Sequence, residues 1–346
     1  MNSEPEHREP LCGMTPADLE RVVGEAGLPR FAAGQIARRL YRHFASDIAE
    51  MTELPMAARE RLSERYCVGL SAPLRVDISC DGTRKYLYGV SGGYFVETAY
   101  IPDGERATLC VSCQAGCRMG CKFCATGRRG LRRSLTSGEI LNQIISLPER
   151  DRLTNIVFMG MGEPFDNLDE VLRALEILTS DKCFGRSPSR ITVSTAGVTA
   201  NLRRFLESTD VRLAVSLHNP FSDERSELMP IERAYPIEEF MEILREYDFS
   251  HRRVSFEYIL LSGLNDTPRH IRGLCRLLNG IKCRINIIRF HRIPGSPYFS
   301  PDDAAVMAFR DALTARGIMT TVRASRGEDI KAACGLLDAS AAESES

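Results

Sequence analysis

The feature that most constrains the fold is a regular alternation of short β-branched segments with helix-length amphipathic stretches. It begins near residue 107 and runs through "TLCVS", "NIVFMG", "RITVS", "VRLAVSL", "VSFEYILL" and "RINIIRF" to a final "MTTVR". Strands that alternate with helices form a parallel sheet with the helices outside it. About six units fall short of a closed eight-unit barrel, so we predict an α/β fold with an open, partial (β/α)6 barrel. Its functional residues should follow the C-terminal ends of the strands.

A dense run of cysteines, "CVSCQAGCRMGCKFC" at 110–124, follows the first of these strands. Only Cys117, Cys121 and Cys124 have C-x3-C-x2-C spacing, because a count that starts at Cys113 reaches Gly120 at the third position. Three thiolates can bind three irons of a [4Fe–4S] cube and leave the fourth iron open. A structural zinc site, which normally needs four protein ligands, and a closed four-cysteine cluster are the alternatives.

Composition narrows the setting of this site. The chain has twelve cysteines and a formal net charge of −1, so overall charge argues neither for nor against an acidic partner. The N-terminal "MNSEPEHREP" lacks an apolar core, and no stretch reaches the roughly 18 apolar residues of a membrane span. We therefore expect a cytoplasmic protein without membrane association. In that compartment cysteines indicate metal binding or redox chemistry more often than structural disulfides.

The three-cysteine motif after the first strand of a partial barrel resembles the radical S-adenosylmethionine (SAM) superfamily. The resemblance implies that SAM chelates the open iron and is cleaved by reduction to a 5′-deoxyadenosyl radical. Four further segments fall at later strand ends: "MGMGEP", "VSTAG", "VSLHNP" and "IIRFHRIPG". By the same resemblance they supply SAM contacts from Gly162, Glu163, Ser194, Ser216, Leu217, His218 and His291, the last at a position where many members carry asparagine.

Longer segments narrow the resemblance to one family. "TLCVSCQAGCRMGCKFCATG", "NIVFMGMGEPFDNLDEVLRAL", "LAVSLHNPFSDERSELMPI" and "RASRGEDIKAACG" resemble the bacterial adenosine carbon-2 methyltransferases, over about residues 12–337. This implies methylation of 23S ribosomal RNA, in the peptidyl transferase centre, and of transfer RNA, next to the anticodon. It also implies one [4Fe–4S] cluster, two SAM molecules per turnover, a low-potential electron donor such as flavodoxin or ferredoxin, and a monomeric enzyme.

The family's reaction gives roles to the remaining thiols. Carbon 2 of adenine has no lone pair and cannot attack the SAM methyl group, but a carbon radical can add to it. The resemblance implies that Cys334 first takes a methyl group and that its S-methyl is then converted to a methylene radical, which adds to carbon 2. Cys110 then attacks the sulfur of Cys334, forms a disulfide and releases the product. Glu97, in "FVETAYIP", matches the proposed proton acceptor, and Cys113 stands where members usually carry serine.

The rest of the chain divides into parts with different patterns. Capping signals at Thr15 and Asp18 open a helical segment, and "SCDGTRKYLYGVSGGYFVETAYI" alternates like a β-meander. We expect a helical RNA-binding accessory module, a β-meander linker, the radical SAM core, and a C-terminal segment with Cys334 and a disordered tail, at 1–70, 71–102, 103–330 and 331–346.

Two questions stay open from sequence alone. Arg38, Arg39 and Arg42 crowd one side of a predicted helix and could contact RNA phosphates or form an ordinary solvated face. A related enzyme that methylates carbon 8 of the same nucleotide, and confers antibiotic resistance, shares the cluster motif and both catalytic cysteines. An iron–sulfur electron carrier or an RNA-binding module without turnover is the alternative from another class.

Overall fold

A ten-stranded sheet forms the body of the protein, and the predicted partial barrel is confirmed. The computed structural model describes residues 8–339, and the strand order is β14-β13-β12-β11-β10-β9-β6-β5-β4-β3. Neighbours from β6 to β14 pair in parallel. These strands are β6 (Arg106–Cys110), β9 (Asn155–Phe158), β10 (Ile191–Thr195), β11 (Arg212–Ser216), β12 (Val254–Leu260), β13 (Cys283–Arg289) and β14 (Met319–Val322).

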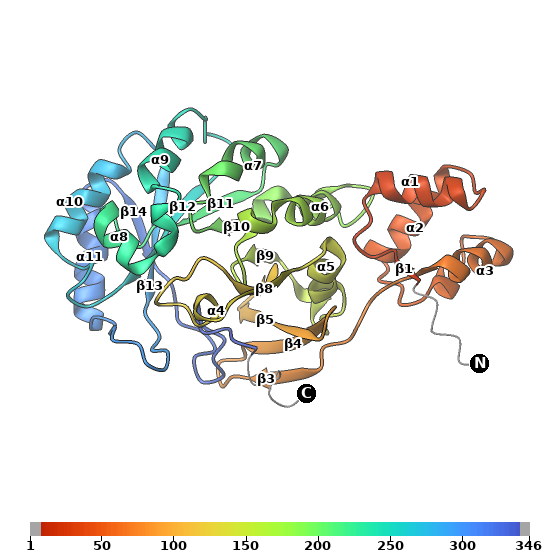
Figure 1. Ribbon diagram of the computed structural model, residues 1–346, viewed down its shortest axis with the longest axis horizontal. Coiled ribbons are helices and arrows are strands. Elements are labelled where there is room, and N and C mark those ends of the chain that lie inside the picture. The colour runs from red at the N-terminus through yellow and green to blue at the C-terminus, as the bar shows by residue number, and fades with distance from the viewer. Residues whose placement is uncertain (1–7, 340–346) are drawn as a thin grey trace.

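Helices cover the outside of these strands (Figure 1). Their apolar residues recur with helical spacing; in α9, for example, Ile237, Phe240, Met241 and Leu244 are all buried. Where one face of a helix is apolar, that face packs against the sheet and the polar face stays in water. The covering helices are α5 (Ser137–Ile145), α6 (Leu168–Thr179), α7 (Leu202–Ser208), α8 (Ser222–Leu228), α9 (Ile237–Arg245), α10 (Pro268–Leu277) and α11 (Asp303–Thr314).

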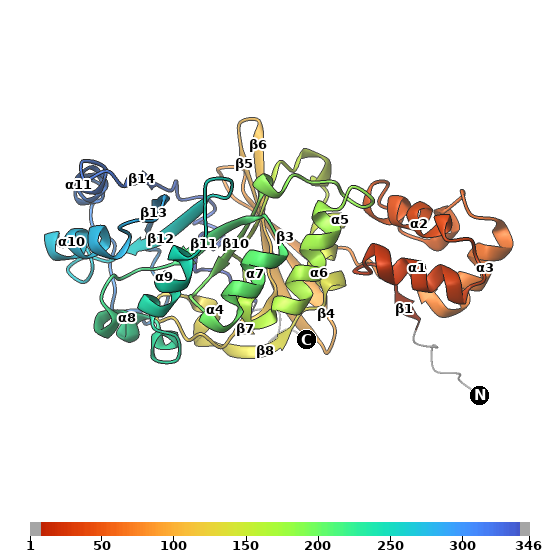
Figure 2. The ribbon, with the colours of Figure 1, turned by 90° about the horizontal axis from the view of Figure 1, so that it is seen from above.

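The predicted β-meander is present and continues the barrel sheet. Strands β3 (Arg75–Ile78), β4 (Arg84–Val90) and β5 (Tyr94–Asp103) pair antiparallel, and β5 pairs antiparallel with β6. The hairpin of β5 and β6 projects past its neighbours in Figure 2. The meander therefore belongs to the same sheet as the barrel strands rather than standing between two separate bodies.

Three helices, α1 (Pro16–Glu25), α2 (Phe31–Tyr41) and α3 (Met56–Arg65), stand beside the barrel (Figure 1). The short strands β1 (Glu9–Pro10) and β2 (Tyr66–Cys67) pair in parallel and bring the two ends of this part together. Thr15 and Asp18 form the predicted capping box of α1. Within residues 8–339, no helix is both long enough and apolar enough to cross a lipid bilayer.

The helical part meets α5 of the barrel through two glycines that touch each other. Gly13 has φ +94°, and a Cβ on it would lie 2.3 Å from the amide nitrogen of Gly138. A Cβ on Gly138 would in turn lie 2.5 Å from the carbonyl oxygen of Cys12. Ser137 Oγ donates a hydrogen bond of 3.1 Å to the Gly13 carbonyl. The two backbones thus pack directly against each other, with no side chain between them.

Residues that follow β14 return across the barrel to the cysteine loop. Ala125 N donates to the Gly335 carbonyl at 2.8 Å, and Thr126 Oγ1 donates to the Leu337 carbonyl at 2.7 Å. These bonds hold the segment that carries Cys334 against the loop that carries the three spaced cysteines. The tail predicted to be disordered falls mostly at 340–346, outside the described residues.

Candidate active site

The cysteine loop leaves the C-terminal end of β6 and is shaped by a small hairpin. Within it, β7 (Gln114–Cys117) pairs antiparallel with β8 (Gly130–Ser134), with an irregularity between Ala115 and Gly116. Gly116 has φ +77°, and a Cβ there would lie 2.0 Å from the Gly130 carbonyl oxygen. Only glycine fits this close approach. The hairpin fixes Cys117 at its end, and the short helix α4 (Ala125–Arg128) follows Cys124.

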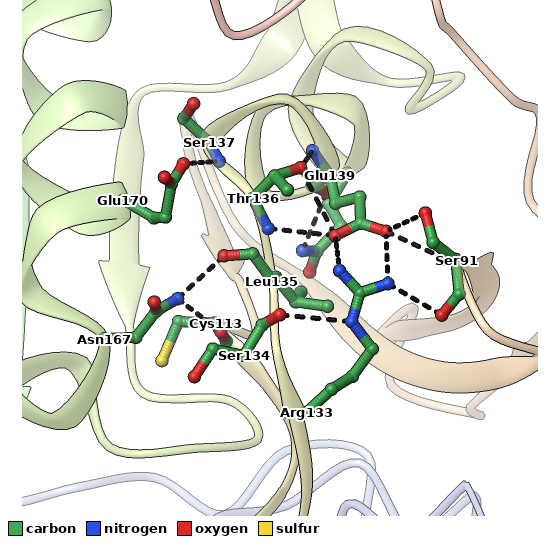
Figure 3. A network of polar contacts seen from close by, with 11 residues as sticks. Ser91, Cys113, Arg133, Ser134, Leu135, Thr136, Ser137, Glu139, Asn167 and Glu170 are labelled. Carbon is green, nitrogen blue, oxygen red and sulfur yellow. Dashed lines mark hydrogen bonds and ion pairs between the residues drawn. The ribbon is translucent and has the colours of Figure 1, made fainter. Parts of the chain in front are cut away.

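A polar network anchors the base of the loop to two helices (Figure 3). Asn167 Nδ2 donates to the carbonyls of Cys113, at 3.0 Å, and Leu135, at 2.8 Å. Glu139 closes the capping box of α5 and pairs with Arg133 at 3.0 Å. The carbonyl of Cys113 therefore belongs to the scaffold. Its thiol is buried in the hydrophobic core, where burial raises its pKa well above the usual range.

A cavity of about 150 Å³ lies at the C-terminal ends of the barrel strands. It brings together most of the residues expected to hold the cluster and SAM. Those that line it are Cys117, Cys121, Cys124, Gly162, Glu163, Ser194, Ser216 and His218. Residues from four separate segments of the chain thus converge on one space, as the strand-end argument requires.

The three spaced thiols fit an iron–sulfur cluster by their chemistry. Burial raises the pKa of Cys117 to about 12 and raises those of Cys121 and Cys124. A thiol in such surroundings stays protonated until a metal displaces the proton. Within residues 8–339, no three or more His, Cys, Asp or Glu side chains are grouped to hold a single metal ion. A cube differs from such a site because each thiolate binds a different iron, so three thiols spread along a loop suit it.

The carboxyl group of Glu163 is held by backbone amides that follow β9 and β10. Its Oε1 accepts from Phe165 N at 2.9 Å and its Oε2 from Ala196 N at 2.7 Å. Burial raises the pKa of this carboxyl to about 7, although both amides pull it down. Gly162 just before it has φ +104°, and a Cβ there would lie 2.6 Å from Gln114 Cβ. The turn thus requires glycine and presents one carboxyl group to the cavity.

His218 lines the same cavity as a neutral ring. Its Nδ1 accepts from Ile259 N at 2.9 Å, so the ring proton is on Nε2. Burial, helped by the nearby Arg225, lowers its pKa to about 3. The backbone has φ +57°, a left-handed conformation, and Asn265 Nδ2 donates to its carbonyl at 2.7 Å. The neutral ring therefore offers a fixed N–H donor at pH values well above 3.

Arg225 was not predicted from sequence, yet it ties the cavity wall together. Its side chain is fully buried and forms an ion pair with the buried Glu232. It donates to the carbonyls of Leu217, Ala196 and Ser216 at 3.0, 2.7 and 2.9 Å. One side chain thereby joins the ends of β10 and β11. The only sequence signal would have been the opposite charges of these two residues, seven positions apart.

A second cavity, of about 270 Å³, adjoins the first and contains the other two expected thiols. Cys110 and Cys334 both line it, and Cys334 also lines the first cavity. Burial raises the pKa of Cys110 to about 12. Arg323, another residue that sequence reasoning missed, places Nη1 at 3.8 Å from Cys334 Sγ and Nε at 3.5 Å from Glu257 Oε2.

Three expected residues lie differently from the prediction. Glu97 lines neither cavity: its Oε1 is 3.0 Å from Lys85 Nζ, and its Oε2 accepts from Asp338 N at 2.7 Å. Leu217 is fully buried and does not line the first cavity; its backbone carbonyl accepts a hydrogen bond from Arg225, which holds the cavity wall. His291 lines the second cavity rather than the first, with Nδ1 at 3.3 Å from Glu328 Oε1.

The predicted arginine face on α2 is partly occupied by the protein itself. Arg39 pairs with Glu53. Arg42 Nε donates to the Cys183 carbonyl at 2.8 Å and so holds the helical part to the barrel. Arg38 is exposed and has no ion pair among the described residues. Arg39 and Arg42 therefore differ from Arg38 in having contacts within the protein, and contact of the three with RNA stays a prediction.

Comparison with known proteins places the chain in a family. Residues 111–275 match the radical SAM superfamily, and residues 10–68 match the ribosomal RNA large subunit methyltransferase N-terminal domain. A probable dual-specificity RNA methyltransferase RlmN of Bacteroides fragilis is 55% identical over 329 residues, which is 95% of this chain and 96% of that protein. The chain belongs to the RlmN family.

Other relatives agree with the RlmN assignment. The dual-specificity RNA methyltransferase RlmN of Syntrophus aciditrophicus is 42% identical over 335 residues, 95% of this chain and 96% of that one. A crystal structure of a radical SAM methyltransferase from Sphaerobacter thermophilus superposes with a TM-score of 0.90 and 42% identity, covering 96% of this chain and 99% of that chain. The family resemblance seen in the sequence is confirmed, and radical SAM membership implies an iron–sulfur cluster and SAM.

Proposed function

We propose that this protein is a radical SAM RNA methyltransferase of dual specificity. On this proposal it methylates carbon 2 of adenosine in 23S ribosomal RNA, at the peptidyl transferase centre, and in transfer RNA next to the anticodon. The observation that carries the proposal is the position of Cys334, whose side chain lines both the cavity of the three spaced cysteines and the cavity of Cys110. A carrier that must first meet SAM and later meet a resolving thiol needs such a shared position.

The residues around the first cavity would hold the cofactors. Cys117, Cys121 and Cys124 would bind one [4Fe–4S] cluster, which when bound supplies the electron that converts SAM into a source of a carbon radical. Glu163 offers a carboxyl group to the amino group of SAM, and His218 offers a fixed N–H. Ser194 and Ser216 add hydroxyls on the same wall. Two SAM molecules would be used per turnover, one for the methyl group and one for the radical.

The thiols in the second cavity would act in sequence. Cys334 is proposed to take the methyl group through its sulfur, and the guanidinium of Arg323 lies 3.8 Å from that sulfur. After its methylene carbon has bonded to carbon 2, the thiolate of Cys110 would attack the sulfur of Cys334. The S–C bond then breaks with its electron pair on the methylene carbon, which takes up a proton and becomes the methyl group, and a disulfide forms as the methylated base leaves. The unpaired electron left by the radical addition would return to the bound cluster. The raised pKa of Cys110 keeps it protonated, and so unreactive, before that step.

Glu97 is proposed to position the carrier segment as well as to accept a proton. In the observed arrangement its carboxylate holds the Asp338 amide and pairs with Lys85, so it fastens the end of the segment that carries Cys334. Proton transfer from carbon 2 would require the carboxylate to release the Asp338 amide. The two roles can therefore alternate within one turnover.

The remaining parts of the chain have proposed roles as well. Residues 1–70 would be an accessory module for RNA, and 103–330 the catalytic core. Residues 71–102, predicted as a linker, connect these two parts along the chain while their strands extend the barrel sheet, and 331–346 would be the carrier segment. Of Arg38, Arg39 and Arg42, Arg38 is best placed to contact an RNA phosphate, because its side chain is exposed and the other two bind groups of the protein itself. We further propose a monomer that works in the cytoplasm with a low-potential electron donor such as flavodoxin or ferredoxin.

One experiment tests the proposal. Reconstituted protein is incubated anaerobically with SAM, a reductant and unmodified ribosomal or transfer RNA, and the digested RNA is compared chromatographically with 2-methyladenosine and 8-methyladenosine. We expect 2-methyladenosine together with 5′-deoxyadenosine. A product that co-elutes only with 8-methyladenosine would reassign the position, and the absence of 5′-deoxyadenosine would point to an electron carrier or RNA-binding module.

A further inference from the structure

Arginines mark the beginning of five barrel strands. Arg106 and Arg212 are the first residues of β6 and β11, Arg190 and Arg253 directly precede β10 and β12, and Arg284 is the second residue of β13. Parallel strands begin at the same edge of a sheet, so these side chains gather at one end of the barrel. That end is opposite the strand ends that carry the thiols.

The five positive charges act on one another, and Glu257 is the one acidic residue whose charge is seen to act on a member of the group, Arg284. Burial lowers the pKa of Arg212, and so do the charges of Arg253, Arg284, Arg190 and Arg106. Such mutual effects require the guanidinium groups to be close together. In the part of the chain that the structure describes, none of the five forms an ion pair with an aspartate or glutamate. Grouped like charges repel one another, so an anion bound among them would be stabilised.

Three of these five arginines line an open cavity of about 590 Å³, which we call the arginine basin. Arg212, Arg253 and Arg284 line it, with Arg252 and Lys282 beside them. The one acidic residue on its wall, Asp210, is 94% exposed in its side chain and lies 3.5 Å from Arg252. Because the whole chain has a net charge of only −1, the positive charge here is a local feature.

We propose that the arginine basin binds phosphate groups. The planar guanidinium fork matches a phosphate and can donate two parallel hydrogen bonds to it, and it stays charged at all physiological pH values. Several forks that converge on one open space suit a group, or a run of groups, with more than one negative charge. Nothing in the proposed chemistry uses this end of the barrel.

The phosphates most available to this protein are those of an RNA backbone, an assignment that rests on the proposed function. Strand β12 has seven residues and spans about 23 Å at 3.3 Å per residue, so a phosphate in the basin is remote from the reacting base. The basin would hold a distant part of a large folded RNA and affect its affinity without touching the radical chemistry. A free polyphosphate, such as that of a nucleotide, is the other source of the same groups.

The test compares two variants of the full-length protein with equal charge. One carries Arg212→Gln, Arg253→Gln and Arg284→Gln. The control carries Arg272→Gln, Arg276→Gln and Arg316→Gln, which change exposed arginines on or near other surface helices. Binding of inorganic tripolyphosphate is measured by calorimetry, and binding of transfer RNA is measured at several salt concentrations.

We expect the basin variant to lose at least tenfold in tripolyphosphate affinity. Its slope of log RNA affinity against log salt should fall by about 2.1–2.7, at 0.7–0.9 for each of the three lost phosphate contacts. Loss of tripolyphosphate binding with an unchanged RNA slope would keep the site and assign it to a free polyphosphate. No change in either measurement relative to the control overturns the proposal.

Two further measurements separate this outcome from other failures. Without ligand, the basin variant should melt at or above the temperature of the unmodified protein, because it loses repulsion and no ion pair; tripolyphosphate should stabilise only the unmodified protein and the control. Release of 5′-deoxyadenosine should be equal in all three. If RNA is not methylated at all but tripolyphosphate still binds the basin, the proposed function fails and this inference stands.

Discussion

Replacing Arg225 with methionine should destabilise the fold and the cavity wall together. The variant leaves Glu232, whose side chain is 1% exposed, without its cation, and it removes the donor shared by three backbone carbonyls. Removing one partner of a buried pair costs about 3–5 kcal/mol. Glu232 keeps hydrogen bonds from Ser222 Oγ and Ile237 N, so we expect the lower half of that range, about 3–4 kcal/mol.

Urea denaturation measures this loss, and equilibrium dialysis measures SAM binding to the reconstituted protein. The control is Arg203→Met, which breaks an exposed pair with Glu246 and should cost much less because water screens it. Adding Glu232→Gln to Arg225→Met should recover part of the stability, since it removes the stranded charge. Equal losses of unfolding free energy in Arg225→Met and Arg203→Met, or an unchanged SAM affinity in Arg225→Met, would contradict this role of Arg225.

Three further predictions concern the cysteines and the Glu163 turn. Cys121→Ala should lose the reconstituted cluster, measured as iron and sulfide content, whereas Cys113→Ala should keep it; the reverse pattern contradicts the assignment. Cys110→Ala should accumulate a protein band shifted by bound RNA on a denaturing gel and Cys334→Ala should show none, so turnover by both would remove both roles. Gly162→Ala should cost about 2–4 kcal/mol through a backbone clash and positive φ, and near-normal stability in urea would refute it.

The fold could be predicted from the sequence because buried residues recur at a regular spacing along each helix and strand. The alternation after residue 107 reports which residues face the core, and "MGMGEP" could be placed at a strand end once the strands were counted. Glu163, Ser194 and Ser216 could therefore be assigned to strand ends without knowledge of contacts between distant residues. In the structure all three line one cavity. The C-x3-C-x2-C spacing of the three candidate cluster cysteines could likewise be read from a short segment of the chain.

Contacts between residues far apart in the sequence could not be predicted from these local patterns. Glu97 accepts a hydrogen bond from an amide 241 residues later, and no periodicity encodes such a partner. Arg225 and Arg323 look like ordinary charged residues until the fold buries one and brings the other to a thiol. Arg42 looked like part of a free basic face, but the loop it holds at Cys183 arrives from elsewhere in the chain.

The contact between Gly13 and Gly138 makes the helical part a stiff extension of the barrel. Ser137, beside Gly138, belongs to the start of α5, in the same polar network that fixes the carbonyl of Cys113 (Figure 3). Close-packed backbone contacts compress little and pass on displacement. An exchange of helical parts between relatives at residue 70 would therefore transfer the helices but lose their fixed angle, unless the matching surface around Gly138 moved with them.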